Sequence, residues 1–410
     1  MFMHILLVSY EFPPAMATGG IGSYMYHLAR LLHSKGHQVS VISASCEDND
    51  QIIDRVFCMN YLVSSSTPTN FRTKALHIFE RHLKADAIDL MESPEVGACA
   101  LDIHLKYPQI PLVVKMHTPG VLITKVSNTY QPLFTKLRYV AGALLRGKID
   151  FGYWSKYDKN KNSNLEYTIC KHADLILSPS LALKKWATSY WQIPEKKIKL
   201  LVNPFTTNDE LFEFPIEGRE KIICFIGKLT VLKGMITFTP ALKKILQANP
   251  LYKAVIIGRD EPVSQKVPSM KKWMVEQLES VIDRVRFTGA LEGADVKKEL
   301  RNSSIVVVPS LWENYPTVVL EAMAAGCAVA ASNKGGIPEI IQHEQNGLLF
   351  NPENTKSIVA TVQELITNTV KQQQLAFAGR QSVKDSSNEE LITLTENLYY
   401  SVLKESAKTI

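Results

Sequence analysis

The stretch that decides the fold is Pro309-Ser-Leu-Trp-Glu-Asn-Tyr-Pro-Thr-Val-Val-Leu-Glu-Ala-Met-Ala-Ala-Gly326. The apolar run Ile305–Val308 before it predicts a buried strand, and Pro316 suits the first turn of a helix that the closing glycine ends. The first N–H groups of a helix have no partner within it, and the helix dipole makes them an anion site suited to a diphosphate. These groups belong to Thr317, Val318 and Val319.

Two carboxylates frame this predicted anion site. Glu313 lies in the loop between the strand and the helix, and Glu321 lies inside the helix. A carboxylate accepts two hydrogen bonds at once, which suits the neighbouring hydroxyls of a ribose or a hexose. Either residue alone is more typical of a solvated surface, but the pair around such a helix favours a binding function. Asn314 and Tyr315, in the same loop, are further candidates for this site.

Short apolar runs alternate with helical patterns on both sides of this stretch. In the second half the runs are Ile222–Ile226, Ala254–Ile257, Val285–Phe287, Ile305–Val308, Ala328–Ala330 and Gly347–Phe350. In the first half they are His4–Ser9, Gln38–Ser43, Ala87–Met91, Leu112–His117 and Leu175–Ser178. Between the first two, Ser23–Lys35 has apolar residues at helical spacing, and Gly36 ends that helix. Strands alternating with helices predict parallel sheets covered on both faces.

The chain of 410 residues is too long for one hydrophobic core, so we expect two domains. The pattern restarts after a polar, proline-containing segment, which predicts an α/β protein with two doubly wound domains at residues 1–205 and 206–385. Ligands bind such sheets outside the carboxyl ends of the strands. Two such domains facing each other would therefore form a binding cleft.

The composition, with 46% hydrophobic and 21% charged residues, is that of an ordinary globular protein. None of the six cysteines lies in a Cys-x-x-Cys pair, which suits buried thiols in a reducing compartment. The N-terminus has no basic segment or cleavage site of a signal peptide, and no apolar run of about 18 residues occurs. We therefore expect a soluble, cytoplasmic protein with no nucleic-acid partner.

The net charge of +6 is unevenly distributed. Up to Phe205 there are 23 Lys and Arg against 16 Asp and Glu, so the first half carries all of the positive excess. A solvated surface explains this excess, and so does attraction to an anionic acceptor or to a membrane surface. Peripheral contact with a membrane through the N-terminal domain therefore stays open.

One segment, Val121–Cys170, interrupts the alternation of strands and helices. It contains Trp and Tyr residues among many charges, with nine basic residues between Lys125 and Lys171 against three acidic ones. We interpret it as helices and loops inserted at the mouth of the cleft, where insertions usually carry specificity. This insert is therefore a candidate region for binding a substrate.

Two lysines follow the strand Ile222–Ile226, in Phe225-Ile-Gly-Lys-Leu-Thr-Val-Leu-Lys-Gly234. Lys228 and Lys233 are compact charges suited to phosphate oxygens, although a solvated surface also explains lysines here. Two basic groups would neutralise a leaving diphosphate without a divalent ion. We therefore expect no metal site and no cofactor.

The pattern Glu313, seven residues, Glu321, then Ala-Met-Ala-x-Gly resembles the donor-site signature of retaining glycosyltransferases of the GT-B fold, family GT4. Gly335-Gly-Ile-Pro-Glu339 and Asn346-Gly-Leu-Leu-Phe350 are similar to that family as well. The resemblance covers nearly the whole chain and is weakest over Val121–Cys170. It implies two Rossmann-like domains facing a central cleft, residues 1–205 for the acceptor and 206–385 for the donor. It also implies that a helix within 386–410 crosses back to the N-terminal domain.

The resemblance also assigns roles to the central residues. It implies that Glu321 holds the ribose, Glu313 the transferred sugar, and the amides near Pro316–Val319 the distal phosphate. Family members usually carry Gly-Arg where this chain has Gly227-Lys228, so charge is kept but bidentate contact is lost. Arg259 and Leu291, after two predicted strands, are placed to meet the nucleotide base.

Two further candidates lie in the first half. Gly19 and Gly20 precede the Ser23–Lys35 helix and are similar to the family's flexible loop that closes over the donor diphosphate. A nicotinamide site would place glycines directly after the first strand, and here about ten residues intervene. His117 ends a strand, where the resemblance implies stabilisation of charge on the reacting sugar, although a structural role is also typical of a lone histidine.

We expect a retaining, metal-independent hexosyltransferase that uses a nucleotide-sugar, with His117, Glu313 and Lys233 nearest the chemistry. A UDP-sugar is slightly favoured over a GDP-sugar. The acceptor is unknown, with a lipid, a glycan or a small metabolite open, and Val121–Cys170 is the candidate region for binding it. The alternatives are a GT-B nucleotide-sugar epimerase or hydrolase and a non-catalytic nucleotide-sugar binding subunit. The basic insert argues against the first alternative, and the retained charged residues argue against the second.

Overall fold

The computed structural model describes residues 2–14, 19–45, 50–53, 56–62, 68–128, 133–149, 158, 160–205, 209–262, 268–384 and 388–406. At 50–53, 56–62, 68–69, 133–136 and 209 it describes the backbone alone. The chain divides into two compact units. Unit 1 comprises Met1–Thr206 with Asn388–Ile410, and unit 2 comprises Thr207–Ser387.

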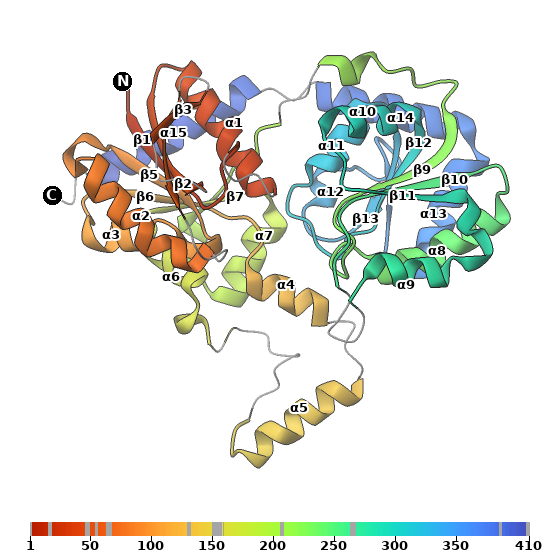
Figure 1. The fold of residues 1–410 in the computed structure, drawn as a ribbon, viewed down its shortest axis with the longest axis horizontal. Coiled ribbons are helices and arrows are strands. Elements are labelled where there is room, and N and C mark those ends of the chain that lie inside the picture. The colour runs from red at the N-terminus through yellow and green to blue at the C-terminus, as the bar shows by residue number, and fades with distance from the viewer. Residues whose placement is uncertain are drawn as a thin grey trace. The chain divides into compact units, whose positions relative to one another are not determined.

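Unit 1 is built on an eight-stranded sheet in which every pairing except β3–β4 is parallel. The spatial order is β3 (Asp50–Ile53), β4 (Val56–Leu62), β2 (Gln38–Ser45), β1 (His4–Val8), β5 (Leu90–Pro94), β6 (Leu112–Lys115), β7 (Leu175–Ser178) and β8 (Ile198–Leu200). The chain therefore reverses its direction of travel across the sheet between β1 and β5. Parallel strands buried on both faces need helices on each side, and Figure 1 shows helices flanking the strands.

The helices of unit 1 are α1 (Gly20–Ser34), α2 (Pro68–His82), α3 (Leu101–Lys106), α4 (Gly120–Ser127), α5 (Leu133–Leu145), α6 (Leu165–His172), α7 (Leu181–Trp186) and α15 (Asn388–Ser406). Single helical turns occur at Ala85–Ala87, Val96–Ala98, Lys161–Ser163 and Glu195–Lys197, and a π-helical turn at Ala187–Trp191. Apolar residues of α1 and α15, such as Leu28 and Ile392, pack with Ile5 and Leu7 of β1 into one buried cluster.

Unit 2 is built on a six-stranded, wholly parallel sheet. The order is β11 (Val285–Gly289), β10 (Lys253–Ile257), β9 (Glu220–Ile226), β12 (Ser303–Val308), β13 (Ala328–Ser332) and β14 (Leu348–Phe350). The helices are α8 (Met235–Ala248), α9 (Met270–Gln277), α10 (Gly293–Asn302), α11 (Thr317–Ala324), α12 (Ile337–Ile340), α13 (Thr355–Thr367) and α14 (Thr369–Lys384), with 3₁₀ turns at Asp209–Glu213 and Glu279–Arg284. Phe238 of α8 and Val362 of α13 pack with Phe225 of β9 in its core.

The strands predicted from apolar runs are all present, with bounds that differ by a few residues. The α/β fold of two doubly wound sheets is therefore confirmed. Three strands were not predicted: β3, β4 and β8. β3 runs antiparallel to β4, so the sheet of unit 1 is not purely parallel as expected.

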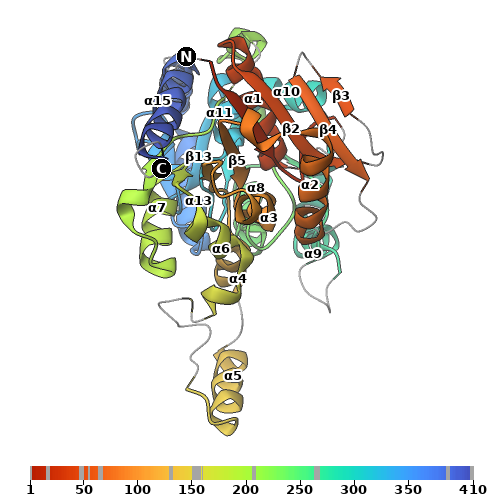
Figure 2. The ribbon, with the colours of Figure 1, turned by 90° about the vertical axis from the view of Figure 1, so that its left-hand side faces the viewer.

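The last helix, α15, packs within unit 1 although it follows unit 2 in the sequence (Figures 1 and 2). Its Tyr399 is fully buried, and the hydroxyl donates a hydrogen bond to Glu92 in β5. Glu396 lies 2.9 Å from the ring of His37, and Asn388 donates to the carbonyl of Phe205 at 2.9 Å. These polar contacts hold the C-terminal helix on the N-terminal sheet.

Candidate active site

Strand order places the candidate residues of unit 2 at one edge of its sheet. β9 and β12 are parallel neighbours, with Ile223 beside Ile305, and the chain moves outward from β9 through β10 and β11. From β12 it moves in the opposite direction through β13 and β14. The loops after β9 and β12 therefore diverge at a topological switch point, where doubly wound sheets leave room for ligands.

Lys233 and Glu313 meet at this switch point. The Lys233 ammonium donates to Oε1 of Glu313, and both side chains are partly buried. Ser310 donates its hydroxyl to the same carboxylate oxygen at 2.8 Å. The two residues are 80 positions apart in the sequence. Because this ion pair orients both side chains, a ligand at this edge of the sheet would contact the ammonium and the carboxylate together.

The amino end of α11 provides the anion site in a slightly different form from the predicted one. Pro316 is the N-cap residue, with extended backbone, and the helix begins at Thr317. The N–H of Val319 donates to the carbonyl of Pro316 at 3.1 Å, so the prediction of three unpaired amides is wrong for Val319. Among the described residues no acceptor is recorded for the N–H groups of Thr317 and Val318. Two donors and the positive end of the helix dipole remain for an anion.

Glu321 lies one turn into α11 and is half-buried. Burial raises the pKa of its carboxyl, and a hydrogen bond from the side chain of Thr317 opposes that rise. A partly buried carboxylate binds paired hydroxyl donors more strongly than an exposed one, because water competes less. This arrangement is compatible with the ribose role that the family resemblance implies.

Gly335 and Gly336 contact the backbone of the loop that carries Glu313. The N–H of Gly336 donates to the carbonyl of Glu313 at 2.7 Å. Gly335 has φ +62°, and a Cβ there would lie 2.0 Å from the Glu313 carbonyl oxygen. Only glycine permits both this backbone conformation and this close approach. The Gly-Gly pair therefore fixes the position of the loop that carries Glu313.

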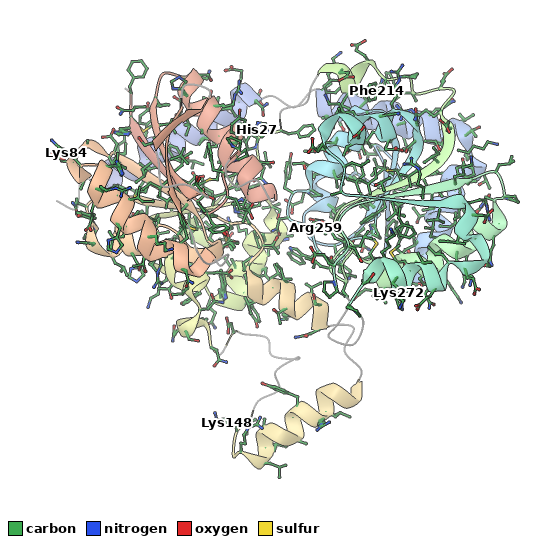
Figure 3. The ribbon with its side chains drawn as sticks, in the orientation of Figure 1. His27, Lys84, Lys148, Phe214, Arg259 and Lys272 are labelled. Carbon is green, nitrogen blue, oxygen red and sulfur yellow. The ribbon has the colours of Figure 1, made fainter. Side chains whose placement is uncertain are left out.

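The remaining donor-site candidates lie around this core. Lys228 and Arg259 are exposed and follow the adjacent strands β9 and β10, and Arg259 (labelled in Figure 3) pairs with Glu261 at 3.1 Å. Asn314 is buried and accepts a hydrogen bond from the Trp312 indole at 2.6 Å. Other partly buried candidates are Tyr315, whose pKa burial raises, and Leu291. These positions are compatible with the predicted roles.

The glycine-rich segment of unit 1 differs from its prediction. Gly19 is the N-cap residue of α1, and the helix begins at Gly20, so the glycines form its first turn instead of a loop before it. The Glu11 carboxylate approaches this end and accepts the N–H of Gly22 at 3.3 Å. An acidic side chain of unit 1 thus lies at the helix amino end that the sequence had suggested for a phosphate.

His117 lies just beyond β6 and is held by a buried carboxylate that sequence reasoning missed. Its N–H donates to both oxygens of Glu95, at 2.9 and 2.8 Å, and its Nδ1 lies 3.5 Å from Oε2. Glu95 is fully buried at the end of β5. The ring of Tyr24 contacts the imidazole edge-on, with centroids 5.4 Å apart. This environment fixes the position of the imidazole at the carboxyl edge of the unit 1 sheet.

A second buried carboxylate, Glu92, lies within β5, three residues before Glu95. Tyr24 and Tyr399 both donate hydroxyl hydrogen bonds to it, and the two tyrosines come from α1 and α15. Lys115, also fully buried, donates to the carbonyl of Leu201. Burial lowers the pKa of Lys115 to about 7, while the charge of Glu92 opposes that shift. Glu92 and Lys115 stand among apolar residues of buried strands. The only sequence feature that could have indicated their burial is a charged residue within an apolar run.

Part of the insert forms helices, as predicted. α4 and α6 flank α5, and within the described parts of 121–170 no strand occurs. Residues 129–132, 150–157 and 159 of this insert lie outside the described residues. Glu166 of α6 accepts the N–H of Gly120 at 2.8 Å and so caps the amino end of α4. No local pattern in the sequence indicates this contact.

Replacing Glu166 by glutamine is expected to stabilise the protein above pH 7. Burial, with the charge of Glu95, raises the pKa of Glu166 from 4.5 to about 7. The folded state then holds a proton that the unfolded state releases, so stability falls as pH rises from about 4.5 to 7, by on the order of 3 kcal/mol. The substituted amide would keep an acceptor for Gly120 without the charge. Thermal melting at pH 5 and pH 8 measures the difference.

The exposed Glu195 provides the matched control, because its side chain is 76% accessible. Glu195→Gln should leave the pH dependence of melting as in the wild type. A Glu166→Gln protein that lost stability with pH as steeply as the wild type would show that Glu166 is ionised throughout.

Within the described ranges, no three His, Cys, Asp or Glu residues gather into a group that could hold a metal ion. The groups suited to a diphosphate at the unit 2 edge are the Lys233 ammonium and the amides of Thr317 and Val318. The groups suited to hydroxyls are Glu313 and Glu321. Chemically, this edge matches a sugar joined to a nucleoside diphosphate.

Two family models match adjoining parts of the chain. The model described as Glycosyltransferase Family 4 matches residues 18–209, and the model Glycosyl transferases group 1 matches residues 207–382. An uncharacterized glycosyltransferase of Methanocaldococcus jannaschii is 27% identical over 389 residues, which cover 89% of this chain and 90% of the relative.

Two solved structures share the fold over nearly their whole length. Sucrose-phosphate synthase from Thermosynechococcus elongatus is 18% identical and matches 98% of this chain and 100% of its own, with a TM-score of 0.75. HepE of Anabaena, solved in complex with UDP and glucose, is 16% identical and matches 99% of each chain, with a TM-score of 0.65. Since the two family models together cover most of both units and the carboxyl-edge site, the chain belongs to the GT-B glycosyltransferases of the family 4 type.

Proposed function

We propose that the protein transfers a hexosyl-type sugar from a nucleoside diphosphate-sugar to an acceptor hydroxyl, with retention of the anomeric configuration and without a divalent metal ion. The proposal rests on one observation: Lys233, Glu313 and the amino end of α11 all lie at the switch point between β9 and β12. Positive groups for a diphosphate and carboxylates for hydroxyls lie there together. The solved relative with UDP and glucose supports a nucleotide-sugar donor.

In this proposal the bond between the sugar C1 and the diphosphate oxygen breaks, and the electron pair leaves with the diphosphate. Lys233 and the N–H groups of Thr317 and Val318 stabilise that charge, because fixed donors need no reorganisation during the reaction. The acceptor oxygen bonds to C1 on the face that the phosphate leaves. Its proton passes to the leaving phosphate oxygen, so no side chain of the protein is required as base.

The carboxylates and the histidine position the sugar in this scheme. Glu321 holds the ribose hydroxyls and Glu313 holds the transferred sugar, which keeps C1 facing the acceptor oxygen on the side that the diphosphate leaves. His117, fixed by Glu95 at the carboxyl edge of unit 1, stabilises positive charge on the sugar or orients its hydroxyls. A UDP-sugar remains the favoured donor over a GDP-sugar. The buried free thiols Cys99, Cys170, Cys224 and Cys327 support a reducing, cytoplasmic location.

Donor turnover in the presence of EDTA tests the proposal. The protein is incubated with UDP-, GDP- and ADP-sugars, and the release of nucleoside diphosphate is followed with and without candidate acceptors. We expect one donor to turn over, faster with an acceptor, and Glu321→Ala to lower that rate about 100-fold because it loses two charge-assisted hydrogen bonds.

Glu276→Ala is the matched control, since Glu276 is exposed on α9 of the same unit. It should turn over the donor as the wild type does. Turnover that no acceptor accelerates would favour the hydrolase or epimerase alternative. No turnover and no thermal stabilisation by any nucleotide would contradict the proposed function.

A further inference from the structure

Helix α5 exposes large apolar side chains along one face. The exposed fractions are 55% for Leu137, 58% for Leu144 and 90% for Leu145. Positions i, i+7 and i+8 share one side of a helix, and the exposed Ala141 lies between them on the same side. None of the described elements packs extensively along α5. An apolar stripe that is left in water is a surface for something else to cover.

The charged residues of α5 and of the segment up to Ile149 are all basic. No Asp or Glu occurs between Asp102 and Asp150, a span of the sequence that contains the whole helix. Arg138, Arg146 and Lys148 are exposed beside the stripe or just beyond its end, and Figure 3 labels Lys148. Within the described part of the chain these three side chains make no ion pair. A partner that covers this stripe should therefore have an apolar interior and a negatively charged surface.

The length of α5 determines whether it could cross a lipid bilayer or only lie on its surface. Its 13 residues span about 20 Å, less than the roughly 30 Å hydrocarbon core of a bilayer. None of the described helices is long and apolar enough to cross a membrane. A short helix with leucines on one side and arginines at its flanks is suited to lie in the plane of a membrane interface.

We propose that α5, with the turn that follows it, docks on an anionic lipid bilayer. Leu137, Leu144 and Leu145 enter the boundary between headgroups and acyl chains, and Arg138, Arg146 and Lys148 meet lipid phosphates. The docking surface belongs to unit 1 and does not depend on the donor chemistry proposed for unit 2. It places the helical insert of unit 1 at a membrane surface, where an acceptor embedded in lipid is presented.

Flotation with vesicles tests this docking. The full chain is mixed with vesicles of phosphatidylcholine, or of phosphatidylcholine with about one-third phosphatidylglycerol, at about 0.1 M salt. We expect binding to the anionic vesicles alone, weakened at higher salt. The double substitution Leu144→Ser, Leu145→Ser should lower the partition coefficient about 10- to 100-fold, because each leucine loses its transfer from water.

The matched control is Leu251→Ser, Leu394→Ser, which removes two leucines that are 72% and 46% exposed, one in the turn before β10 and one on α15. It should bind vesicles as the wild type does, and circular dichroism melting should show both variants folded. The proposal would be overturned if the wild-type protein did not bind anionic vesicles, or if the Leu144→Ser, Leu145→Ser variant bound them as well as the wild type. A dimer in analytical ultracentrifugation that only this variant abolishes, without vesicle binding, would instead make the stripe an interface between two copies.

Discussion

Replacing Lys233 by alanine is expected to lower kcat/KM for sugar transfer by about 100- to 1000-fold, the range seen when one fixed donor to a developing anion is removed. Lys233 is the cation that lies against Glu313 at the switch point, and it follows β9 where a leaving diphosphate would meet it. The charge it would neutralise grows as the C1–O bond breaks, so the loss should fall on kcat more than on KM. Steady-state kinetics with the donor identified in the panel measures this split.

Lys253→Ala is the matched control for Lys233→Ala. Lys253 is an exposed lysine at the beginning of β10, on the amino edge of the same sheet. It removes the same formal charge from the same unit, so its kinetics should equal those of the wild type. A Lys233→Ala enzyme with unchanged kcat would show that the ammonium only anchors Glu313 and takes no part in stabilising the diphosphate.

Replacing Gly335 by alanine is expected to lower kcat/KM for sugar transfer although the residue carries no functional group. The new Cβ would lie 2.0 Å from the Glu313 carbonyl oxygen and 2.9 Å from its nitrogen, and the backbone has φ +62°. Packed structure relaxes only partly, so the loop that carries Glu313 has to move by about an ångström or more. A displacement of about 1 Å can cost about 100-fold in rate. We expect that loss in kcat/KM, with a free energy of unfolding lower by about 2–4 kcal/mol.

Gly293→Ala controls for the change of residue type. Gly293 begins α10, and a Cβ there would meet nothing within 4 Å. This variant should melt and turn over donor as the wild type does. If Gly335→Ala gave a protein with wild-type melting and kinetics, the Glu313 loop would tolerate displacement, and its assigned role in holding the sugar would fail.

Much of the fold follows from local patterns in the sequence. Short aliphatic runs such as Ile305–Val308 are strands because a parallel strand is buried on both faces. Pro316 and Gly326 bound α11 because proline starts a helix readily and glycine accepts φ +74° after its end. The site residues after β9 and β12 were predicted for the same reason, since strand ends could be located.

What the sequence did not predict depends on long-range contacts. The pairing of Lys233 with Glu313 requires β9 and β12 to be neighbours, and strand order is not encoded in either local pattern. The buried carboxylates Glu92 and Glu95 are stabilised by donors far away in the sequence, among them Tyr399. The two further strands at the β3 edge of the sheet differ from each other. β3 has four residues, two of them polar, and gives little apolar signal, whereas β4 has six hydrophobic residues in seven and could have been predicted from its sequence.

The central claim is that the edge of the unit 2 sheet at β9 and β12 is a diphosphate site, and calorimetric titration tests it most directly. UDP, GDP and ADP, each beside its monophosphate, are titrated into the protein in EDTA. The structure predicts one site per chain for one diphosphate, bound at least about 10-fold more tightly than the monophosphate because Lys233 and two amides act on the second phosphate. Equal affinity for monophosphate and diphosphate, or no binding of any nucleotide, would contradict the account.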